Sequence, residues 1–329
     1  MTPSEIQGVR QRAVIAIGGN SLIKDKDHQT VGDQYQALKE TSYHIADMIQ
    51  EGWDVAIGHG NGPQVGFILR RSEIAAKAIG MHEVPLDACG ADTQGALGYA
   101  LQQNLHNELR RRGIAKHVAT VVTQVRVDRD DPAFANPTKP IGGFLEEAEA
   151  RERAARDGWS VVEDAGRGWR RVVASPFPQE IVELPAVRTL LDAGIITITV
   201  GGGGIPVAYD EEGDLRGVPA VIDKDFASSL LARSIDADLF LISTAVECVF
   251  LHFHTPQQAA IDRMTTTEAR RYVAEGHFAR GSMEPKIRAC ISFVEAGGPS
   301  RVAIITDPPH ISAALHGLTG TRVVHDEAA

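Results

Sequence analysis

The chain has 329 residues, of which 43% are apolar and 23% charged, and its formal net charge is −10. This is ordinary globular composition with enough apolar residues for a sizeable core. The acidic balance argues against nucleic acid or an anionic membrane as a partner, because both require a basic protein face, and no stretch approaches the ~20 apolar residues of a membrane span.

Short apolar runs alternate with amphipathic helical patterns along most of the chain. We expect strands at Ala13–Ile17, Asp54–Ile57, His117–Thr123, Ile195–Val200, Asp238–Ile242 and Arg301–Ile305. We expect helices at Asp33–Glu51, Pro63–Ala78, Ala91–Arg112, Lys224–Ser234 and Ser282–Glu295. Such alternation predicts an α/β fold whose largely parallel sheet is covered on both faces. Ligands of these sheets bind beyond the carboxyl ends of the strands.

One segment interrupts the alternation. Residues 126–177 are rich in Asp, Pro, Gly, Arg and Glu, with a short helical pattern over Leu145–Arg156. We interpret this lid segment as an insertion between the two halves of a single domain.

The cysteines and the start of the chain indicate a compartment. Cys89, Cys248 and Cys290 are widely spaced, which argues against a disulfide framework or a zinc site. The first residues are polar and lack the apolar region of a secretory signal. We therefore expect a cytoplasmic protein.

Three glycine-rich loops directly follow predicted strands. They read Gly18-Gly19-Asn20, Gly58-His59-Gly60-Asn61-Gly62-Pro63 and Gly201-Gly202-Gly203-Gly204-Ile205-Pro206. Glycine lets the backbone approach a ligand closely, and a helix that starts just afterwards adds a positive dipole end suited to phosphate. Pro63 fits the first position of such a helix. One glycine cluster is more often only a tight turn, but three at one sheet edge favour a phosphate site.

Familiar alternatives are poorly supported. No Gly-Lys pair occurs, so there is no P-loop. The loop at Gly201–Pro206 departs from the G-x-G-x-x-G pattern, because Pro206 stands where the third glycine belongs, and a nicotinamide dehydrogenase is a weak alternative. His59 closes a strand, where a histidine is more often structural than catalytic.

Lysine is scarce, with only eight among the 33 lysines and arginines. Five lie in polar loops or on helix faces, where we expect them to be solvated: Lys24, Lys26, Lys39, Lys77 and Lys116. The other three have unusual settings. Lys139 lies between two prolines, and Lys224 lies between Asp223 and Asp225. Lys286 is the last residue of the segment Gly281–Lys286, directly after a proline. Lysine is a compact charge on a long stem that can follow a moving phosphoryl group.

These features together predict phosphoryl transfer, which depends mainly on positioning and electrostatic stabilisation. Asp223 and Asp225 could hold the lysine ammonium groups, or one of them could position a metal-bound water. The sequence offers no obvious general base. A carboxylate-like oxygen needs none, because it is already anionic at neutral pH, so the pattern fits an acyl phosphate better than a sugar or alcohol.

The motifs, in this order, resemble those of the carbamate kinases in the amino acid kinase family almost end to end. The matching segments are Ala16–Asn20, His59–Gly66, Pro85–Cys89, Asn136–Gly142, Glu163–Arg170, Gly201–Pro206, Val221–Asp225 and Gly281–Lys286. The segments Asn136–Gly142 and Glu163–Arg170 resemble the protruding subdomain of carbamate kinases, which separates them from acetylglutamate and uridylate kinases.

The resemblance implies an open αβα sandwich that forms a homodimer. An N-terminal lobe (12–190) would bind carbamoyl phosphate, and a C-terminal lobe (191–326) would bind the nucleotide. The implied reaction is reversible phosphoryl transfer from carbamoyl phosphate to ADP, giving ATP and carbamate, within arginine metabolism. Mg²⁺ would accompany ATP or ADP through the nucleotide phosphates, with no ligand from the protein.

Position by position, the resemblance also assigns residues. The catalytic group would be Lys139, Lys224, Asp225 and Lys286. The substrate and phosphate would be held by Gly18, Gly19, Asn20, Gly60, Asn61, Gly62, Gly202 and Gly203. The nucleotide side would comprise Asp223, Ala245, Val246, Val249, Met283 and again Lys286.

The chain departs from the family pattern on the nucleotide side. It reads Val246-Glu247-Cys248-Val249 where Val-Asp-x-Val is usual, Phe250–His254 is unusual, and Glu284 replaces an expected Gly or Leu. Two alternatives therefore stay open: another small-acid kinase of the same fold, and a catalytically weak regulatory paralogue.

Overall fold

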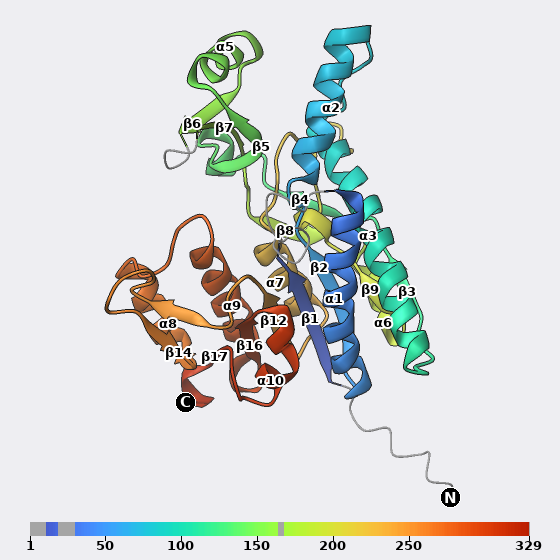
Figure 1. Ribbon diagram of the computed structural model, residues 1–329, viewed down its shortest axis with the longest axis vertical. Helices are drawn as coiled ribbons and strands as arrows, with labels where there is room; N and C mark the ends of the chain where they lie inside the picture. Colours follow the sequence, from blue (N-terminus) through green and yellow to red (C-terminus); the bar gives the residue numbers. More distant parts are fainter. Residues whose placement is uncertain (1–10, 19–29, 164–167, 329) are drawn as a thin grey trace, which may run out of the picture.

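The computed structural model describes residues 11–18, 30–163 and 168–328 (Figure 1). Its central sheet has eight strands in the order β15-β17-β16-β12-β1-β2-β9-β3. Their bounds are β1 Arg12–Ile17, β2 Asp54–His59, β3 Val118–Thr120, β9 Ile196–Ile198, β12 Leu239–Ser243, β15 Arg263–Thr265, β16 Val302–Thr306 and β17 Thr321–Val324. Neighbouring strands are parallel except for the antiparallel pair β16–β17. The predicted α/β fold with a largely parallel sheet is confirmed.

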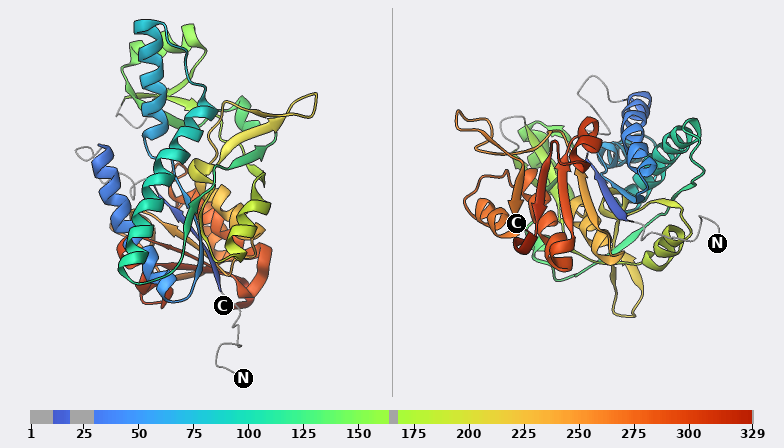
Figure 2. Two further views of the ribbon diagram at one scale, coloured as in Figure 1. Left: turned by 90° about the vertical axis from the view of Figure 1, so that its right-hand side faces the viewer. Right: turned by 90° about the horizontal axis from the view of Figure 1, so that it is seen from below.

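Helices cover both faces of this sheet because its strands are apolar on both sides. In β1, Ala13 and Ile15 pack into one core while Val14 and Ala16 pack into the other. The first core also contains side chains of α1 (Val31–Gln50), α3 (Leu86–Arg111) and α10 (Ile311–Leu315). The second contains those of α6 (Leu184–Asp192), α7 (Lys224–Ser234), α8 (Thr266–Ala274) and α9 (Met283–Gly297). The result is the expected three-layer αβα arrangement (Figure 2).

The chain also forms smaller sheets besides the central one. Four strands run in the order β11-β10-β4-β8, and β13 pairs with β14. Their bounds are β4 Gln124–Val127, β8 Pro178–Ile181, β10 Ile205–Tyr209, β11 Leu215–Gly217, β13 Val249–Leu251 and β14 Ala259–Ile261. The lid segment carries a three-stranded sheet, β5-β7-β6. Its elements are α4 Pro132–Ala135, β5 Lys139–Leu145, α5 Glu147–Asp157, β6 Ser160–Glu163 and β7 Trp169–Val173.

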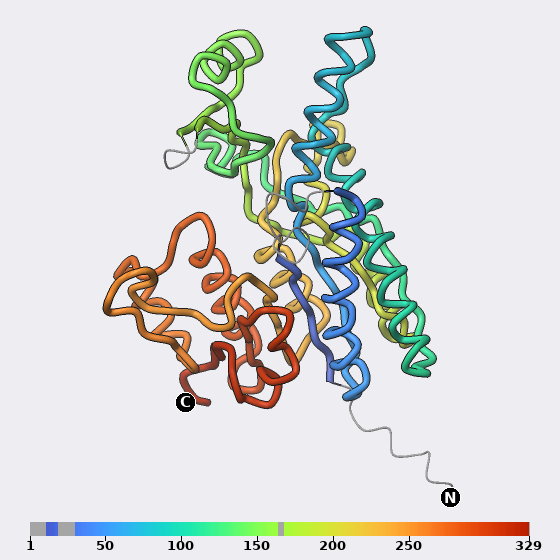
Figure 3. The backbone as a smooth tube through the Cα atoms, viewed as in Figure 1, coloured from blue at the N-terminus to red at the C-terminus, as the bar shows by residue number. Residues whose placement is uncertain are grey.

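The lid segment stands beside α2 (Gln64–Ile79), beyond the carboxyl end of β1 (Figures 1 and 3). The two backbones touch, since a Cβ atom added to Gly66 would lie 2.5 Å from the Cα of Gly142. Farther out, the guanidinium groups of Arg153 and Arg171 lie 4.1 and 4.4 Å from the ring centre of Trp159. Arg153 also donates a 2.6 Å hydrogen bond to Glu73 on α2. The lid segment is thereby packed firmly onto this helix.

The strand predicted at His117–Thr123 is too long. The amide of Gln94 on α3 bonds to both backbone groups of Thr123, at 2.7 and 3.0 Å. A side chain thus replaces the sheet ladder there, and β3 ends at Thr120.

Helix boundaries also differ from the prediction. Helix α3 begins at Leu86, directly after Pro85, and α2 begins at Gln64, with Pro63 just before its first residue. No helix in the described part of the chain is both long and apolar enough to cross a membrane.

Candidate active site

The glycine-rich loops meet at the carboxyl ends of the central strands, on the side of the molecule where the lid segment lies. The Gly18 N–H donates to the Ser243 carbonyl at the end of β12 (2.9 Å), and the Gly60 N–H donates to Ile17 at the end of β1 (3.0 Å). A Cβ atom on Gly60 would lie 3.2 Å from Cδ of Lys224, so the lysine stem passes directly over this glycine. The predicted residues Gly19 and Asn20 lie outside the described residues.

The third loop fits closely between the second loop and the start of α7. It begins at Val200, a non-glycine residue with φ of 46°, and continues through Gly202 and Gly203 with φ of 68° and 96°. A Cβ atom on Gly202 would overlap Oδ1 of Asn61, and one on Gly203 would overlap the carbonyl oxygen of Ile222. Only glycine permits both the backbone conformation and this close approach.

Asn61 is held in place at this contact. Its Oδ1 accepts a 2.6 Å hydrogen bond from the Thr93 hydroxyl on α3, and its Nδ2 lies 3.4 Å from the Gly202 carbonyl. The neighbouring Gly62 has φ of 53°. Gly60, Asn61, Gly62, Gly202 and Gly203 therefore lie together, as the sequence suggested.

A carboxylate on α7 joins two of the three selected lysines. Asp225 is only 2% exposed. It accepts hydrogen bonds from the Lys224 ammonium through Oδ1 and from the Lys286 ammonium through Oδ2, the latter at 2.9 Å. Lys286 comes from the first turns of α9, so Asp225 connects the starts of two helices.

The electrostatics of this group follow from burial opposed by pairing. Burial alone would raise the pKa of Asp225, but the charges and hydrogen bonds of Lys224 and Lys286 outweigh it and hold the pKa below its ordinary value. Burial lowers the pKa of Lys224, although Asp225 opposes this shift. Burial also acts to lower the pKa of Lys286, but Asp225 outweighs it and the pKa is raised.

The third lysine arrives from the lid segment. Asp223 is the N-cap of α7, and its Oδ1 accepts the Asp225 backbone N–H at 2.9 Å. Its Oδ2 accepts a 2.7 Å hydrogen bond from the Lys139 ammonium at the start of β5. All three selected lysines thus belong to one network with Asp223 and Asp225, beside the glycine loops. We call this set of five residues the lysine network.

The remaining lysines are elsewhere. Lys39 and Lys77 are exposed, while Lys24 and Lys26 fall outside the described residues. Lys116 differs from the prediction, because it is half-buried and its ammonium lies 2.8 Å from Asp54. Asp54 is the first residue of β2. This pair therefore lies at the amino end of the strand, whereas the lysine network lies beside the loops at the carboxyl ends.

The surroundings of His59 are those of a structural residue, as the sequence suggested. Its ring is buried, with Nδ1 2.9 Å from the Gly60 carbonyl oxygen. Burial lowers its pKa, and the hydrogen bond with Gly60 opposes the shift only in part. A Cβ atom on Gly201 would lie 2.5 Å from Nε2, so His59 packs tightly beneath the third glycine loop.

A cavity of about 410 Å³ begins at the lysine network and lies between the loop after β12 and the start of α9. We call it the Lys286 cavity. Its lining residues are Thr244, Ala245, Val246, Phe250, Phe253, His254, His277, Phe278, Ala279, Ser282, Met283 and Lys286. An apolar, aromatic wall that ends at an ammonium group suits a flat base joined to phosphates.

Four of the predicted nucleotide residues line this cavity: Ala245, Val246, Met283 and Lys286. Asp223 lies in the lysine network instead. Val249 is fully buried in the core, and its backbone N–H bonds to the Thr321 hydroxyl at 2.7 Å. Of the departures from the family pattern, Glu284 bonds to Arg288 at 2.8 Å, whereas Phe250, Phe253 and His254 line the cavity.

Some residues that line the Lys286 cavity were not predicted from the sequence. His277, Phe278 and Ala279 join its wall from the segment between α8 and α9. The one signal in the sequence for an aromatic cavity wall was the aromatic and histidine content of Phe250–His254, which we noted only as unusual for the family.

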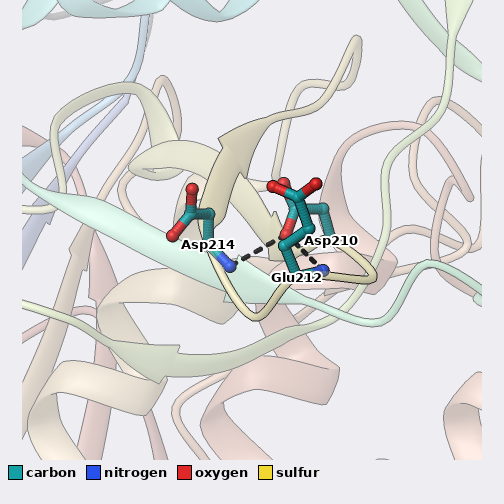
Figure 4. Close-up of side chains that lie close together, drawn as sticks. All are labelled: Asp210, Glu212 and Asp214. Atoms are coloured by element: carbon teal, nitrogen blue, oxygen red, sulfur yellow. Dashed lines mark hydrogen bonds between the residues drawn. The ribbon is translucent and has the colours of Figure 1, made fainter.

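One acidic cluster could hold a metal ion by proximity alone. Within the described residues, three possible ligands come together only at Asp210, Glu212 and Asp214, in the β10–β11 hairpin (Figure 4). Oδ1 of Asp210 accepts the backbone N–H groups of Glu212 and Asp214, at 3.0 and 2.8 Å. Arg216 pairs with both aspartates. These contacts explain the cluster as the means of shaping an exposed turn.

Comparison with known proteins places this geometry in a family. The model of the amino acid kinase family matches residues 11–306. The chain is 50% identical to the carbamate kinase-like protein YahI of Escherichia coli over 96% of this chain and 99% of that protein. It is 48% identical to the carbamate kinase of Clostridium perfringens over 95% and 99% of the two chains.

A solved structure agrees along the whole chain. The carbamate kinase from Giardia lamblia bound to AMP-PNP superimposes with a TM-score of 0.89 at 40% identity, covering 96% of this chain and 99% of that one. Full-length identity at this level, together with the shared fold, shows that the chain belongs to the amino acid kinase family and, within it, to the carbamate kinases.

Proposed function

We propose that this chain transfers the phosphoryl group of carbamoyl phosphate to ADP, reversibly, giving ATP and carbamate. The observation that carries the proposal is the lysine network. Three ammonium groups, from the lid segment, α7 and α9, are held by two carboxylates beside backbone amides of the glycine loops. Such an arrangement suits a phosphoryl group in transit, whose charge is spread over its equatorial oxygens.

The chemistry follows from the groups present. An oxygen of the terminal phosphate of ADP attacks the phosphorus, the bond from phosphorus to the carbamoyl oxygen breaks, and carbamate leaves as an anion. The attacking oxygen is already ionised, so the site needs no general base. Lys139, Lys224 and Lys286 are the catalytic lysines of this proposal, and Asp225 keeps two of them in position before substrates bind.

The substrates would approach from opposite sides. We assign carbamoyl phosphate to the N-terminal lobe (12–190), at Gly18, Gly60, Asn61 and Gly62; the assignment of Gly19 and Asn20 to the same substrate stays a prediction from the sequence. Gly202 and Gly203 would contact the phosphate. We assign the nucleotide to the C-terminal lobe (191–326), in the Lys286 cavity. Lys286 supports this division, because it lines the cavity and also bonds to Asp225.

Magnesium enters this proposal as part of the substrate MgADP. The carboxylates of Asp223 and Asp225 are engaged by lysines, so we assign the ion to the nucleotide phosphates. It would neutralise phosphate charge there. The protein contributes the ammonium groups that face the transferring phosphoryl.

We also propose a cytoplasmic homodimer. Val31 and Tyr99, on α1 and α3, are 78% and 63% exposed, and a second copy would cover such apolar side chains. All three cysteines are free, as suits a reducing compartment. Sedimentation of the purified chain tests the oligomer directly.

The proposed reaction is tested by coupled ATP formation. The purified chain, given carbamoyl phosphate and MgADP, should form ATP, and acetylglutamate with MgATP should give no turnover. If carbamoyl phosphate is ignored while another acyl phosphate supports ATP formation, the chain is a different small-acid kinase and our substrate assignment is wrong.

One observation favours a second candidate, a regulatory paralogue with little activity. The departures at Phe250, Phe253 and His254 all lie in the wall of the Lys286 cavity. Calorimetric titration with MgADP separates the candidates. Binding without turnover of any acyl phosphate, or no binding at all, would favour the regulatory candidate.

A further inference from the structure

Three arginine side chains line a cavity that shares no residue with the lysine network or the Lys286 cavity. Arg233 comes from α7, Arg270 from α8 and Arg288 from α9. The cavity has a volume of about 430 Å³, which falls within the range of small-molecule sites. We call it the arginine cavity.

The arginine cavity is open to solvent and lies away from the proposed dimer surface. The side chains of Arg270 and Arg288 are 60% and 52% exposed. Helices α7, α8 and α9 pack on one face of the central sheet, whereas α1 and α3, which carry Val31 and Tyr99, pack on the other. A second copy bound at Val31 and Tyr99 would therefore leave the arginine cavity accessible.

Arg233 is a cation without a counter-charge. It is half-buried, and among the residues that the structure describes no carboxylate pairs with its guanidinium and its Nε has no hydrogen-bond acceptor. Burial lowers the pKa of Arg233, and the charge of Arg301 lowers it further. A cation in this position is stabilised by an opposite charge nearby. Because Nε is enclosed, an anion in the cavity would meet the terminal Nη groups of the guanidinium.

The other two arginines are paired, but the wall as a whole stays positive. Arg270 donates to Glu295 at 2.9 and 2.5 Å, and Arg288 donates to Glu284 at 2.8 Å. Of the described residues in the wall, Glu295 alone is acidic. Three positive charges against one negative charge give the wall a net charge of +2, which favours an anionic ligand.

The rest of the wall is largely apolar and includes two phenylalanines. Phe177, the last residue of the lid segment, is 61% exposed, and its ring centre lies 4.6 Å from that of Phe226 on α7. Val273 and Ile291 add aliphatic surface from α8 and α9. A flat apolar group can therefore pack on this side of the cavity while an acidic group reaches Arg233.

We propose that the arginine cavity binds a small organic acid in which a carboxylate or phosphate group is joined to a flat apolar body. Guanidinium groups match the oxygen geometry of both acidic groups. Arg233 supplies the unpaired charge, and Phe177 and Phe226 hold the apolar body. This inference does not depend on the proposed reaction.

The test uses three fluorescent probes that share one ring system: naphthoate, naphthyl phosphate and the neutral naphthamide. Each is titrated into the full chain, and probe fluorescence reports binding. The better acidic probe should bind with a Kd of about 1 mM or lower, the affinity that ordinary ligand efficiency predicts for a molecule of this size. Naphthamide should bind at least about tenfold more weakly. The tighter of the two acids identifies carboxylate or phosphate as the preferred group.

Two variants locate the probe. Arg233→Gln should raise the Kd of the acidic probes at least about tenfold, the scale of losing hydrogen bonds to a charged group, and should leave naphthamide binding unchanged. Ser292→Asp places a negative charge in the wall and should weaken the acidic probes to a similar extent. It decides the matter if urea unfolding shows that Arg233→Gln is not folded.

Arg216→Gln is the matched control, because Arg216 is 59% exposed in the β10–β11 hairpin. Its affinity for all three probes should equal that of the wild type. Competition with MgADP tests the Lys286 cavity as the binding site, because its aromatic wall also ends at a cation. Saturating MgADP should leave probe binding unchanged.

The remaining outcomes overturn this inference. They are displacement of the probe by MgADP, equal affinity of folded Arg233→Gln and the wild type, no preference for the acids over naphthamide, and no binding of either acid. A chain that makes no ATP from carbamoyl phosphate overturns the proposed function instead and leaves this inference standing.

Discussion

Lys286 and Asp225 are joined by a 2.9 Å hydrogen bond across 61 positions of the sequence. This contact fixes the start of α9 against the start of α7, and it connects the proposed nucleotide side of the site to the proposed phosphoryl side. Because the carboxylate is almost fully buried, the two helices cannot shift independently without exposing an unpaired charge. The ammonium groups of Lys224 and Lys286, which we propose to be catalytic, are therefore held in place by one carboxylate.

Removing any lysine of the network should greatly slow the reaction. We expect Lys139→Ala, Lys224→Ala and Lys286→Ala each to lower kcat at least ~10²-fold, the scale of losing one preorganised electrostatic contact. The measurement is the coupled ATP assay.

Lys116→Ala is the matched control, because the ion pair of Lys116 with Asp54 lies at the amino end of β2, away from the lysine network. Its kcat should stay near the wild-type value. Four equal losses would show that the three network lysines have no special role.

Asp225→Asn should change how stability depends on pH. The pKa of Asp225 is lower in the folded protein than in the unfolded chain, so its stabilisation is complete above its ordinary pKa of about 3.9 and is lost as the pH falls toward the lower, folded-state value. Through that window one such group steepens the loss by up to about 1.4 kcal/mol per pH unit.

Urea unfolding between pH 5 and pH 3 (roughly the window set by these pKa values) measures this slope. The variant should be less stable at neutral pH, because Lys224 and Lys286 lose their counter-charge, but its acid slope should be shallower. An unchanged slope would contradict the depressed pKa.

Gly202→Ala should damage the site through the backbone. The residue has φ of 68°, and the added methyl group would overlap Asn61. We expect the free energy of unfolding to fall by about 2 kcal/mol and turnover to be lost.

Gly95→Ala is its control. Gly95 lies within α3, is exposed, and has nothing within 4 Å of an added Cβ atom. Its stability should rise by about 0.5–1 kcal/mol with normal turnover. A harmless Gly202→Ala would show that the loop does not need its close approach.

Glu73→Gln should act on turnover through the lid segment. Glu73 bonds to Arg153, whose guanidinium packs on Trp159, and the same segment delivers Lys139. A looser attachment should reduce kcat by about tenfold, equivalent to 1.4 kcal/mol. Glu152→Gln, which alters an exposed pair with Arg156, should have no effect.

A double variant identifies the route of this effect. In the Lys139→Ala background, Glu73→Gln should cause no further loss of kcat. Additive losses would mean that Glu73 acts by some route other than the position of Lys139.

Much of the site could be predicted because its chemistry is local in sequence. Glycine loops follow strands, and an Asp-Lys-Asp triplet opens a helix, so short motifs revealed Gly60, Gly202 and Lys224. The partners of the lysines are long-range: Lys139 meets Asp223 across 84 positions, and no pattern within either segment specifies that pairing. The sequence suggested only that Asp223 and Asp225 could hold lysine ammonium groups, without saying which aspartate pairs with which lysine.

The misses have physical causes as well. The strand predicted through Thr123 ends early because a side-chain amide from α3 takes over its backbone bonds. Val249 looks like a loop residue in sequence, yet it is buried in the core. The wall at His277 and Phe278 depends on how two distant segments pack, which periodicity does not report.

The two attachments of the lid segment are unequal. Toward α2 it is fastened by a backbone contact at Gly66 and by the Trp159 stack with its ion pair. Toward α7 it is joined by Phe177, whose ring packs 4.6 Å from that of Phe226, and by the Lys139–Asp223 pair. The lysine of this pair is 33% exposed, and rupture of the pair would cost on the order of 1 kcal/mol or less. Since Asp223 caps α7 through its other oxygen, swinging Lys139 away leaves the helix start intact. At Asp223, the position of the Lys139 side chain and the cap of α7 are therefore independent of each other, because each uses a different carboxylate oxygen.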